Sequence, residues 1–248
     1  MKRSFRRRQQ PPREIEWRTA PQIADCIDVQ AAAPKRTVVH GDALAWLDGF
    51  EPQASHAIVT SLPDVSELPS RDMGVWTEWF RDAAARCLSK LVEGNVAIFF
   101  QTDIKSEGRW IDKGFLVQTA AAQDPSVRLL WHKIVCRAPP GTTTFGRPAY
   151  AHMLCFTREL PMQMDRSTPD VIAAAGKTLW NRGMGLRACE VACKYVRDQT
   201  SCTTVLDPFC GVGTTLAVAN ALGLDAIGVE LNKKRALRSE ALVLLPEV

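Results

Sequence analysis

Residues 203–231 contain the pattern that most restricts how this chain of 248 residues can fold. An apolar and β-branched run, 203–206, leads into a turn that contains Gly211 and Gly213. The spacing that follows predicts a helix over 214–222, closed by Gly223, and then a strand over 226–229 that ends on Glu230. A strand, a glycine-rich turn, a helix and a second strand in this order predict a βαβ unit with two parallel strands.

The rest of the chain continues this alternation of strands and helices. We expect strands over 37–40, 57–60 and 95–100, helices over 43–47, 76–91, 108–122, 186–196 and 233–245, and an antiparallel pair over 128–136 and 150–156. Such alternation predicts an α/β fold: a doubly wound, Rossmann-like sheet, mostly parallel, with one antiparallel hairpin. The hydrophobic content of 46% is enough to bury the core of such a domain.

The amino-terminal segment differs in composition from the remainder. Residues 1–13 hold six Lys and Arg and no acid, whereas the remainder holds 25 basic and 27 acidic residues, so the net charge of +4 comes from this end. We expect residues 1–35 to be a basic, largely flexible arm with at most a short helix at 21–29, and residues 36–248 to form the folded domain. Such an arm either keeps a protein soluble or contacts phosphates.

Two further features bear on location and metal binding. No apolar run approaches the roughly 20 residues that span a bilayer, and no apolar segment follows the basic start, so we expect a cytoplasmic protein without a membrane partner. An organelle presequence within residues 1–20 is the alternative.

The eight Cys form no C-x-x-C pair and no Cys/His set at zinc-ligand spacing, so we expect buried thiols, structural His and no metal ligand.

The residues of the glycine-rich turn indicate the chemistry of its ligand. Glycines allow the backbone to approach a ligand closely, and Glu230 at the tip of the next strand suits a ribose diol. The turn lacks the third glycine of a dinucleotide motif, and Asp207 would repel a pyrophosphate. A carboxylate there suits a cationic group such as the ammonium or sulfonium of S-adenosylmethionine.

The segment D207-PFCGVGT-T215 resembles the cofactor motif of the amino-methyltransferases that modify the exocyclic nitrogen of adenine or cytosine in nucleic acid. The order is the circularly permuted one, in which the catalytic motif comes first. Gly41-Asp42 and the tetrapeptide Ser61-Leu62-Pro63-Asp64 are similar to that family's Gly-Asp segment and its Asp/Asn/Ser-Pro-Pro-aromatic motif, and the resemblance covers roughly residues 37–245.

This resemblance implies S-adenosylmethionine as the cofactor. The cofactor-binding residues that it implies are Asp42, Asn181, Asp207, Pro208, Phe209, Gly211, Gly213, Thr214, Thr215 and Glu230. The catalytic residues that it implies are Ser61, Leu62, Pro63 and Asp64. For Asp42 the cap of the following helix is an alternative role, and for Asn181 the family's usual neighbours are absent.

The tetrapeptide explains how an unreactive amine could be methylated. The lone pair of an exocyclic amine is delocalised into the ring, and two acceptors that bind its hydrogens favour the pyramidal form. Ser61 Oγ and the carbonyl of Leu62 would be these acceptors, with Pro63 stiffening the loop. The transfer would be an in-line displacement that depends mainly on alignment.

The sequence departs from the family at two positions of this motif. Leu62 replaces the first Pro, and Asp64 replaces the aromatic residue that stacks on the base, which forfeits about 1 to 3 kcal/mol. Three interpretations of Asp64 stay open: it accepts hydrogen bonds from a base edge such as that of guanine, it accepts a proton, or the pocket has lost its activity.

We therefore expect methylation of an exocyclic amine in nucleic acid. Only residues 158–177 are available for target recognition. This shortage favours RNA over DNA as the substrate, or else a protein partner that supplies recognition. We expect residues 1–13 to contact the nucleic acid. Arg137 and Arg147, at the loop 138–148, would contact it as well unless this loop is only a solvated connection. The alternatives are an inactive RNA- or ribonucleoprotein-binding protein, a DNA N4-cytosine or N6-adenine methylase, and methylation of a protein amide or a small amine.

Overall fold

A single eight-stranded sheet forms the centre of the computed structural model, which describes residues 17–19, 33–160 and 167–246. Its first five strands are parallel, β8 runs antiparallel to β4 and β7, and β9 runs parallel to β7. Across the sheet the strands are β2 (Arg36–His40), β11 (Asp225–Glu230), β10 (Thr204–Asp207), β3 (His56–Thr60), β4 (Ala97–Gln101), β8 (Tyr150–Thr157), β7 (Arg128–Cys136) and β9 (Val171–Ile172).

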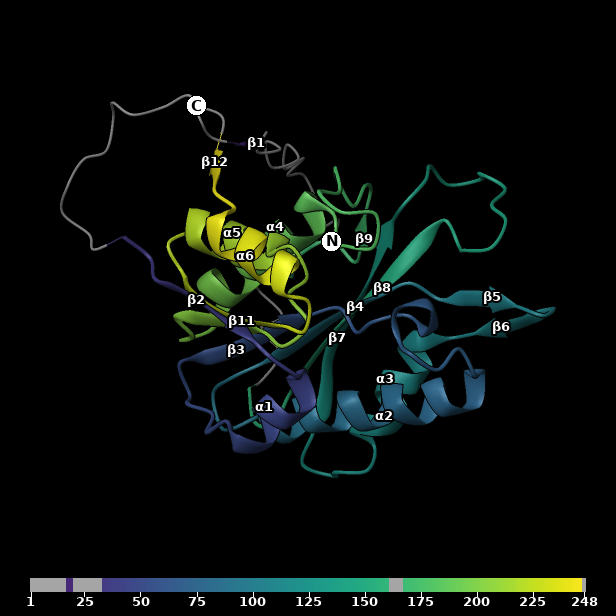
Figure 1. Ribbon diagram of the computed structural model, residues 1–248, viewed down its shortest axis with the longest axis horizontal. Coiled ribbons are helices and arrows are strands. Elements are labelled where there is room, and N and C mark those ends of the chain that lie inside the picture. The colour runs from purple at the N-terminus through teal and green to yellow at the C-terminus, as the bar shows by residue number, and fades with distance from the viewer. Residues whose placement is uncertain (1–16, 20–32, 161–166, 247–248) are drawn as a thin grey trace, which may run out of the picture.

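Helices cover both faces of this sheet (Figure 1). One layer consists of α1 (Ala43–Gly49), α2 (Met73–Ser89) and α3 (Lys113–Ala121), and the other of α4 (Leu186–Gln199), α5 (Thr214–Ala221) and α6 (Lys233–Ala241). The side chains of β4 alternate between the two cores, with Ile98 packing on the α4/α5 side and Phe99 on the α2/α3 side. The predicted fold, a mostly parallel doubly wound sheet with an antiparallel hairpin, is confirmed.

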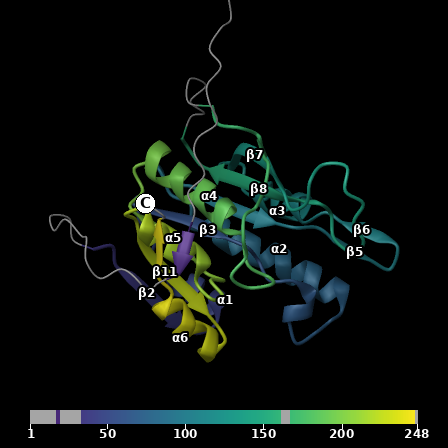
Figure 2. The same cartoon turned by 90° about the horizontal axis from the view of Figure 1, so that it is seen from above.

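Two of the expected helix boundaries are wrong. Instead of a helix from residue 108, β5 (Ile104–Ser106) and β6 (Arg109–Ile111) form a hairpin that turns at Gly108 with φ of +72°, and it projects from the domain in both views (Figure 1, Figure 2). Helix α3 begins only after Asp112, whose Oδ1 accepts a hydrogen bond from Phe115 N at 2.7 Å and so caps the helix. The last helix ends at Ala241, and β12 (Leu244–Pro246) follows it.

The expected arm contains one described element. The strand β1 (Trp17–Thr19) pairs antiparallel with β12, so these three residues are not a free tail. The basic residues 1–13 and the helix expected at 21–29 lie outside the described residues. Within the described part, no helix is both long enough and apolar enough to span a bilayer.

Candidate active site

The carboxyl ends of the five parallel strands meet at one edge of the sheet, and the loops that follow them surround a cavity of about 860 Å³. Almost every site residue expected from the sequence contributes to its wall. These residues are Asp42, Ser61, Leu62, Pro63, Asp64, Asn181, Asp207, Pro208, Phe209, Gly211, Thr214, Thr215 and Glu230, together with Arg137 and Arg147. The expected cofactor and catalytic segments therefore belong to one cavity.

A buried hydrogen bond joins the two halves of this cavity. Thr60 Oγ1, at the end of β3, donates to Asp207 Oδ1, at the end of β10, over 2.7 Å, although the residues are 147 positions apart. The two strands are parallel neighbours in the sheet. The glycine-rich turn and the tetrapeptide loop thus lie side by side.

Asp207 is a buried carboxylate with few compensating charges. The residue is 4% exposed, and burial raises its pKa to about 6, against the smaller opposing effects of hydrogen bonds from Thr60 and from Phe209 N. A buried carboxylate whose pKa is raised by desolvation gains stability when a cation binds beside it. The side of the cavity formed by Asp207 therefore suits a cationic ligand.

The two glycines of the turn have different roles. Both adopt left-handed backbone conformations, with φ of +58° at Gly211 and +82° at Gly213. Gly211 lines the cavity, whereas Gly213 does not, and a Cβ at Gly213 would lie 2.3 Å from Ser239 Oγ. Gly213 therefore has a packing role, since its missing side chain lets the turn approach α6, and its contact with a cofactor stays a prediction.

Glu230 ends β11 and is held by the segment after it. Its Oε1 accepts hydrogen bonds from Asn232 N at 2.7 Å and from Arg235 Nε at 2.9 Å. Arg235 also lines the cavity, so the carboxylate is partly neutralised before any ligand binds. Within the described part of the chain, Oε2 takes no hydrogen bond and is the oxygen left for a ligand hydroxyl.

Asp42 has the structural role that was its alternative. Its Oδ1 accepts a hydrogen bond from Ala45 N at 2.9 Å and caps α1. Asp42 also lines the cavity, as does Asn181, so a contact of either residue with a cofactor stays a prediction.

The tetrapeptide loop is anchored beneath the cavity. Leu62 is buried among the side chains of the α2 layer, and the carbonyl of Pro63 accepts a hydrogen bond from Trp76 Nε1 at 3.2 Å. Trp76 itself is fully buried. Ser61 is half-buried and lines the cavity, where its hydroxyl can meet a substrate.

Asp64 forms ion pairs with both of its oxygens. Oδ1 lies 2.8 Å from Lys113 Nζ, and Oδ2 pairs with Arg147 Nη2. The residue is 7% exposed, and although burial alone would raise its pKa, the two cations outweigh burial and lower it. A carboxylate with a lowered pKa and two bound cations is a poor proton acceptor, so that role does not suit this arrangement, whereas a hydrogen bond from a base edge to Asp64 stays a prediction.

Lys113 is a site residue that could not be predicted from the sequence. It is buried at the first position of α3, 49 residues after Asp64, and its ammonium lies 5.7 Å and 5.5 Å from the ring centroids of Trp76 and Phe80. In the sequence, a single Lys at the start of an apolar helix does not indicate an ion pair with a residue 49 positions away. Arg147 pairs with Asp64 in the structure, and its expected contact with a phosphate stays a prediction.

Comparisons with known proteins agree with this architecture. The family model described as DNA methylase, N6_N4_Mtase, matches residues 201–240, which include the glycine-rich turn and Glu230. No curated protein matches the chain in sequence.

Solved structures match over most of the chain. TTHA0409 of Thermus thermophilus, assigned as a DNA modification methylase and solved with S-adenosylmethionine, is 21% identical, with 84% of this chain and 92% of that chain covered and a TM-score of 0.63. The cytosine-N4-specific PvuII DNA methyltransferase is 13% identical, with 84% and 86% covered and a TM-score of 0.65. The M1.HpyAVI complex with S-adenosylmethionine is 15% identical, with 83% and 98% covered and a TM-score of 0.55.

Likeness at these identities concerns the fold, and the family model adds sequence similarity in the segment that forms the cofactor side of the cavity. The resemblance to the DNA amino-methylase family is therefore confirmed, in sequence over residues 201–240 and in fold over most of the chain.

Proposed function

We propose that the protein is an S-adenosylmethionine-dependent methyltransferase that acts on an exocyclic amino group of a base in nucleic acid. The observation that carries the proposal is the Thr60–Asp207 hydrogen bond, which holds a cofactor-type turn and an acceptor-type loop against each other in one cavity. Catalysis by alignment requires this proximity of the donor and acceptor sites.

The residues on the cofactor side fit S-adenosylmethionine. When bound, this cofactor supplies an electrophilic methyl group on a sulfonium. Asp207 offers a buried carboxylate to a positive charge, and Glu230 Oε2 can accept a hydrogen bond from a ribose hydroxyl. Gly211 leaves the cavity wall without a side chain at the turn, so that a ligand can approach the backbone. Two of the similar structures were solved with this cofactor, which supports the assignment.

The residues on the acceptor side provide hydrogen-bond acceptors rather than a strong base. Ser61 Oγ and the carbonyl of Leu62 would bind the two hydrogens of the amine, while the hydrogen bond from Trp76 to Pro63 holds the loop still. Asp64, paired with Lys113 and Arg147, would shape the acceptor side of the cavity without taking up a proton.

DNA is the substrate that we place first. The sequence has few residues available for target recognition, which favoured RNA as the substrate. However, this chain covers 92% of the length of TTHA0409, so a protein of similar size is assigned as a DNA modification methylase. The family model is also described as a DNA methylase, and the PvuII enzyme as a DNA methyltransferase. A preference for RNA and a partner protein that supplies recognition therefore have no support beyond the sequence argument.

Calorimetry and mass spectrometry test the proposal. We expect S-adenosylmethionine and its demethylated product to bind at one site per chain, and incubation with DNA and RNA to yield a methylated adenine or cytosine nucleoside. Ser61→Ala should lower the methylation rate with little change in cofactor affinity, whereas the matched control Ser201→Ala, exposed at the opposite edge of the sheet, should leave both unchanged. If neither cofactor form binds, the proposal is wrong.

A binding protein without activity is the second candidate, and the Asp64 ion pairs favour it. They occupy the position at which the family has an aromatic residue, and they link the loop 138–148 to the tetrapeptide. Cofactor binding without methylation of any nucleoside in DNA or RNA would select this candidate.

A further inference from the structure

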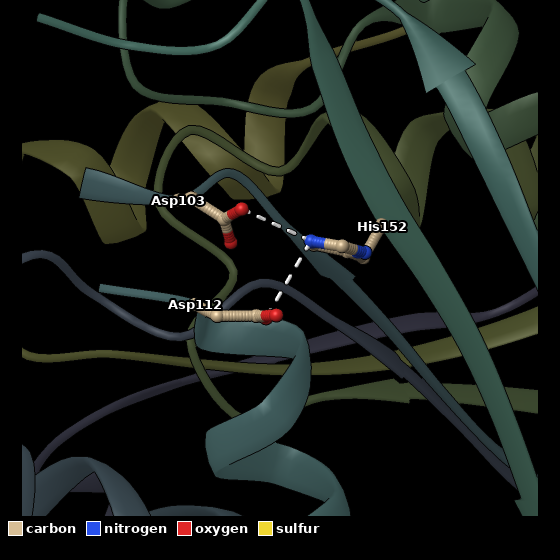
Figure 3. A group of neighbouring side chains, drawn as sticks. All are labelled: Asp103, Asp112 and His152. Atoms are coloured by element: carbon tan, nitrogen blue, oxygen red, sulfur yellow. Dashed lines mark hydrogen bonds and ion pairs between the residues drawn. The ribbon is translucent and has the colours of Figure 1, made fainter. Parts of the chain in front are cut away.

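A second group of chemically reactive side chains lies outside the cavity, at the start of α3. Asp103 follows β4, Asp112 precedes α3, and His152 comes from β8; the three point toward one another (Figure 3). One ligand atom from each, a carboxylate oxygen or an imidazole nitrogen, lies within 4.8 Å of the other two. None of the three lines the cavity described above. We propose that this group binds one divalent transition-metal ion, of the class of Zn²⁺ or Mn²⁺.

Two of the three separations are close to the edges of a coordination polyhedron, and the third is within 4.8 Å. His152 Nε2 lies 3.1 Å from Asp103 Oδ2 and 3.6 Å from Asp112 Oδ1. Ligand atoms about 2.1 Å from a zinc ion at tetrahedral or octahedral angles are roughly 3.0 to 3.5 Å apart. An ion can therefore enter between the three atoms with small side-chain movements.

Each ligand is held by a group outside the set. His152 Nδ1 lies 3.0 Å from His132 Nε2, Asp103 Oδ1 accepts from Lys113 N at 2.9 Å, and Asp112 Oδ1 accepts from Phe115 N at 2.7 Å. A hydrogen bond on the far nitrogen of a ligating His fixes the ring and leaves the other nitrogen to face the metal. Gly114 packs so closely on the imidazole that a Cβ there would lie 2.9 Å from His152 Cγ, which restricts the ring further.

Burial and access also suit a metal ion. The side chain of Asp103 is 1% exposed and that of His152 9%, whereas that of Asp112 is 51% exposed, so that one ligand remains open to solvent. Two carboxylates and one imidazole form a mixed oxygen and nitrogen set, which suits Zn²⁺ or Mn²⁺ better than the all-oxygen preference of Ca²⁺.

An independent observation indicates a missing polar partner beside this group. Gln101 is fully buried, and within the described part of the chain neither its amide nitrogen nor its amide oxygen has a hydrogen-bond partner. It lies directly opposite His152 in the register of β4 and β8, so the two side chains share one face of the sheet. Buried amides are rarely left unpaired, and an unpaired one commonly marks a bound ion or water. A hydrated ion at the Asp103, Asp112 and His152 group would supply polar partners in this region.

Metal titration of the whole chain without an affinity tag tests the proposal. We expect calorimetry with Zn²⁺ alone or Mn²⁺ alone to show one site per chain, and the Mn²⁺ complex to show one coupled imidazole nitrogen by electron paramagnetic resonance. Asp112→Asn removes a charged ligand but keeps a residue that caps helices equally well, so the variant should fold and bind the metal at least about tenfold more weakly.

Asp72→Asn is the matched control, because Asp72 caps α2 in the same way, with its Oδ1 accepting from Val75 N at 2.9 Å. We expect this variant to bind metal like the unmodified chain. If neither metal binds, or if Asp112→Asn binds as tightly as the control, the group is a hydrogen-bonded imidazole between two carboxylates and the proposal is wrong. Cofactor binding plays no part in this readout, so failure of the metal site and failure of the proposed methyltransferase function remain distinguishable.

Discussion

Replacing the buried carboxylate of Asp207 by an amide should stabilise the fold at neutral pH. The pKa of Asp207 is raised from 3.8 to about 6, so the folded protein binds this proton more tightly than the unfolded chain does. Ionisation of the carboxyl therefore costs stability progressively between about pH 4 and pH 6, and the full cost persists above that range. An Asn at this position can still accept the hydrogen bonds of Thr60 and Phe209 N without carrying the charge.

The shift sets the size of the effect. Each pKa unit corresponds to about 1.4 kcal/mol, so a shift of roughly two units gives about 3 kcal/mol. For a chain of this length, that is a rise of about 6 to 12 °C in the unfolding midpoint at pH 8, with almost no difference at pH 4.

Urea unfolding at a series of pH values measures this difference directly. Asp170→Asn, at a side chain that is 88% exposed, is the control and should show no such pH dependence. If Asp207→Asn does not raise the free energy of unfolding, or raises it equally at pH 4 and pH 8, then burial of this charge does not destabilise the folded protein and the reasoning is wrong.

The same charge should govern cofactor affinity in the opposite direction. An ionised Asp207 attracts a cation, so S-adenosylmethionine should bind more tightly as the pH rises through about 6, by up to about tenfold per pH unit below that value. In Asp207→Asn the affinity should be lower and independent of pH over this range. Calorimetry at pH 5 and pH 7.5 distinguishes the two cases, and equal pH dependence in both proteins would contradict the argument.

Three further predictions concern the cavity wall. Lys113→Met should lower the free energy of unfolding in urea by about 3 to 5 kcal/mol, because it leaves the buried Asp64 carboxylate with one partner fewer. The double variant Lys113→Met with Asp64→Leu should recover most of that loss, and additive losses would contradict the buried pair. Glu230→Gln should weaken S-adenosylmethionine binding about 10- to 100-fold in calorimetry, as expected for losing a charge-assisted hydrogen bond, and unchanged affinity would exclude the ribose contact. Gly213→Ala should lower the unfolding midpoint more than Gly223→Ala, because both have positive φ but only Gly213 also lies against a neighbouring side chain.

Features of the fold and the site that depend on residues close together in the sequence could be predicted. The alternation of strands and helices predicted the sheet, and the glycines with Asp207 and Glu230 predicted one wall of the cavity, since a βαβ unit places these residues at the same edge. The departure of Asp64 from the family motif was visible as well, but its consequence was not.

Contacts between distant segments could not be predicted. Asp64 pairs with Lys113, and His152 approaches Asp103, each across 49 positions, so no local period or spacing in the sequence indicates either contact. The β5–β6 hairpin was mistaken for the start of a helix because a run of only a few residues does not distinguish a short strand from a helical turn. Asp112, the residue that caps α3, was the local signal for that boundary.

Lys113 contacts both the proposed metal site and the proposed active site. Its backbone nitrogen donates to Asp103 at the proposed metal site, while its ammonium binds Asp64 at the wall of the cavity. Thermodynamic reciprocity then requires that any free energy by which an ion alters target binding equals the free energy by which the target alters ion binding. Any such coupling would pass through the first residue of α3, whose backbone and side chain contact the two proposed sites.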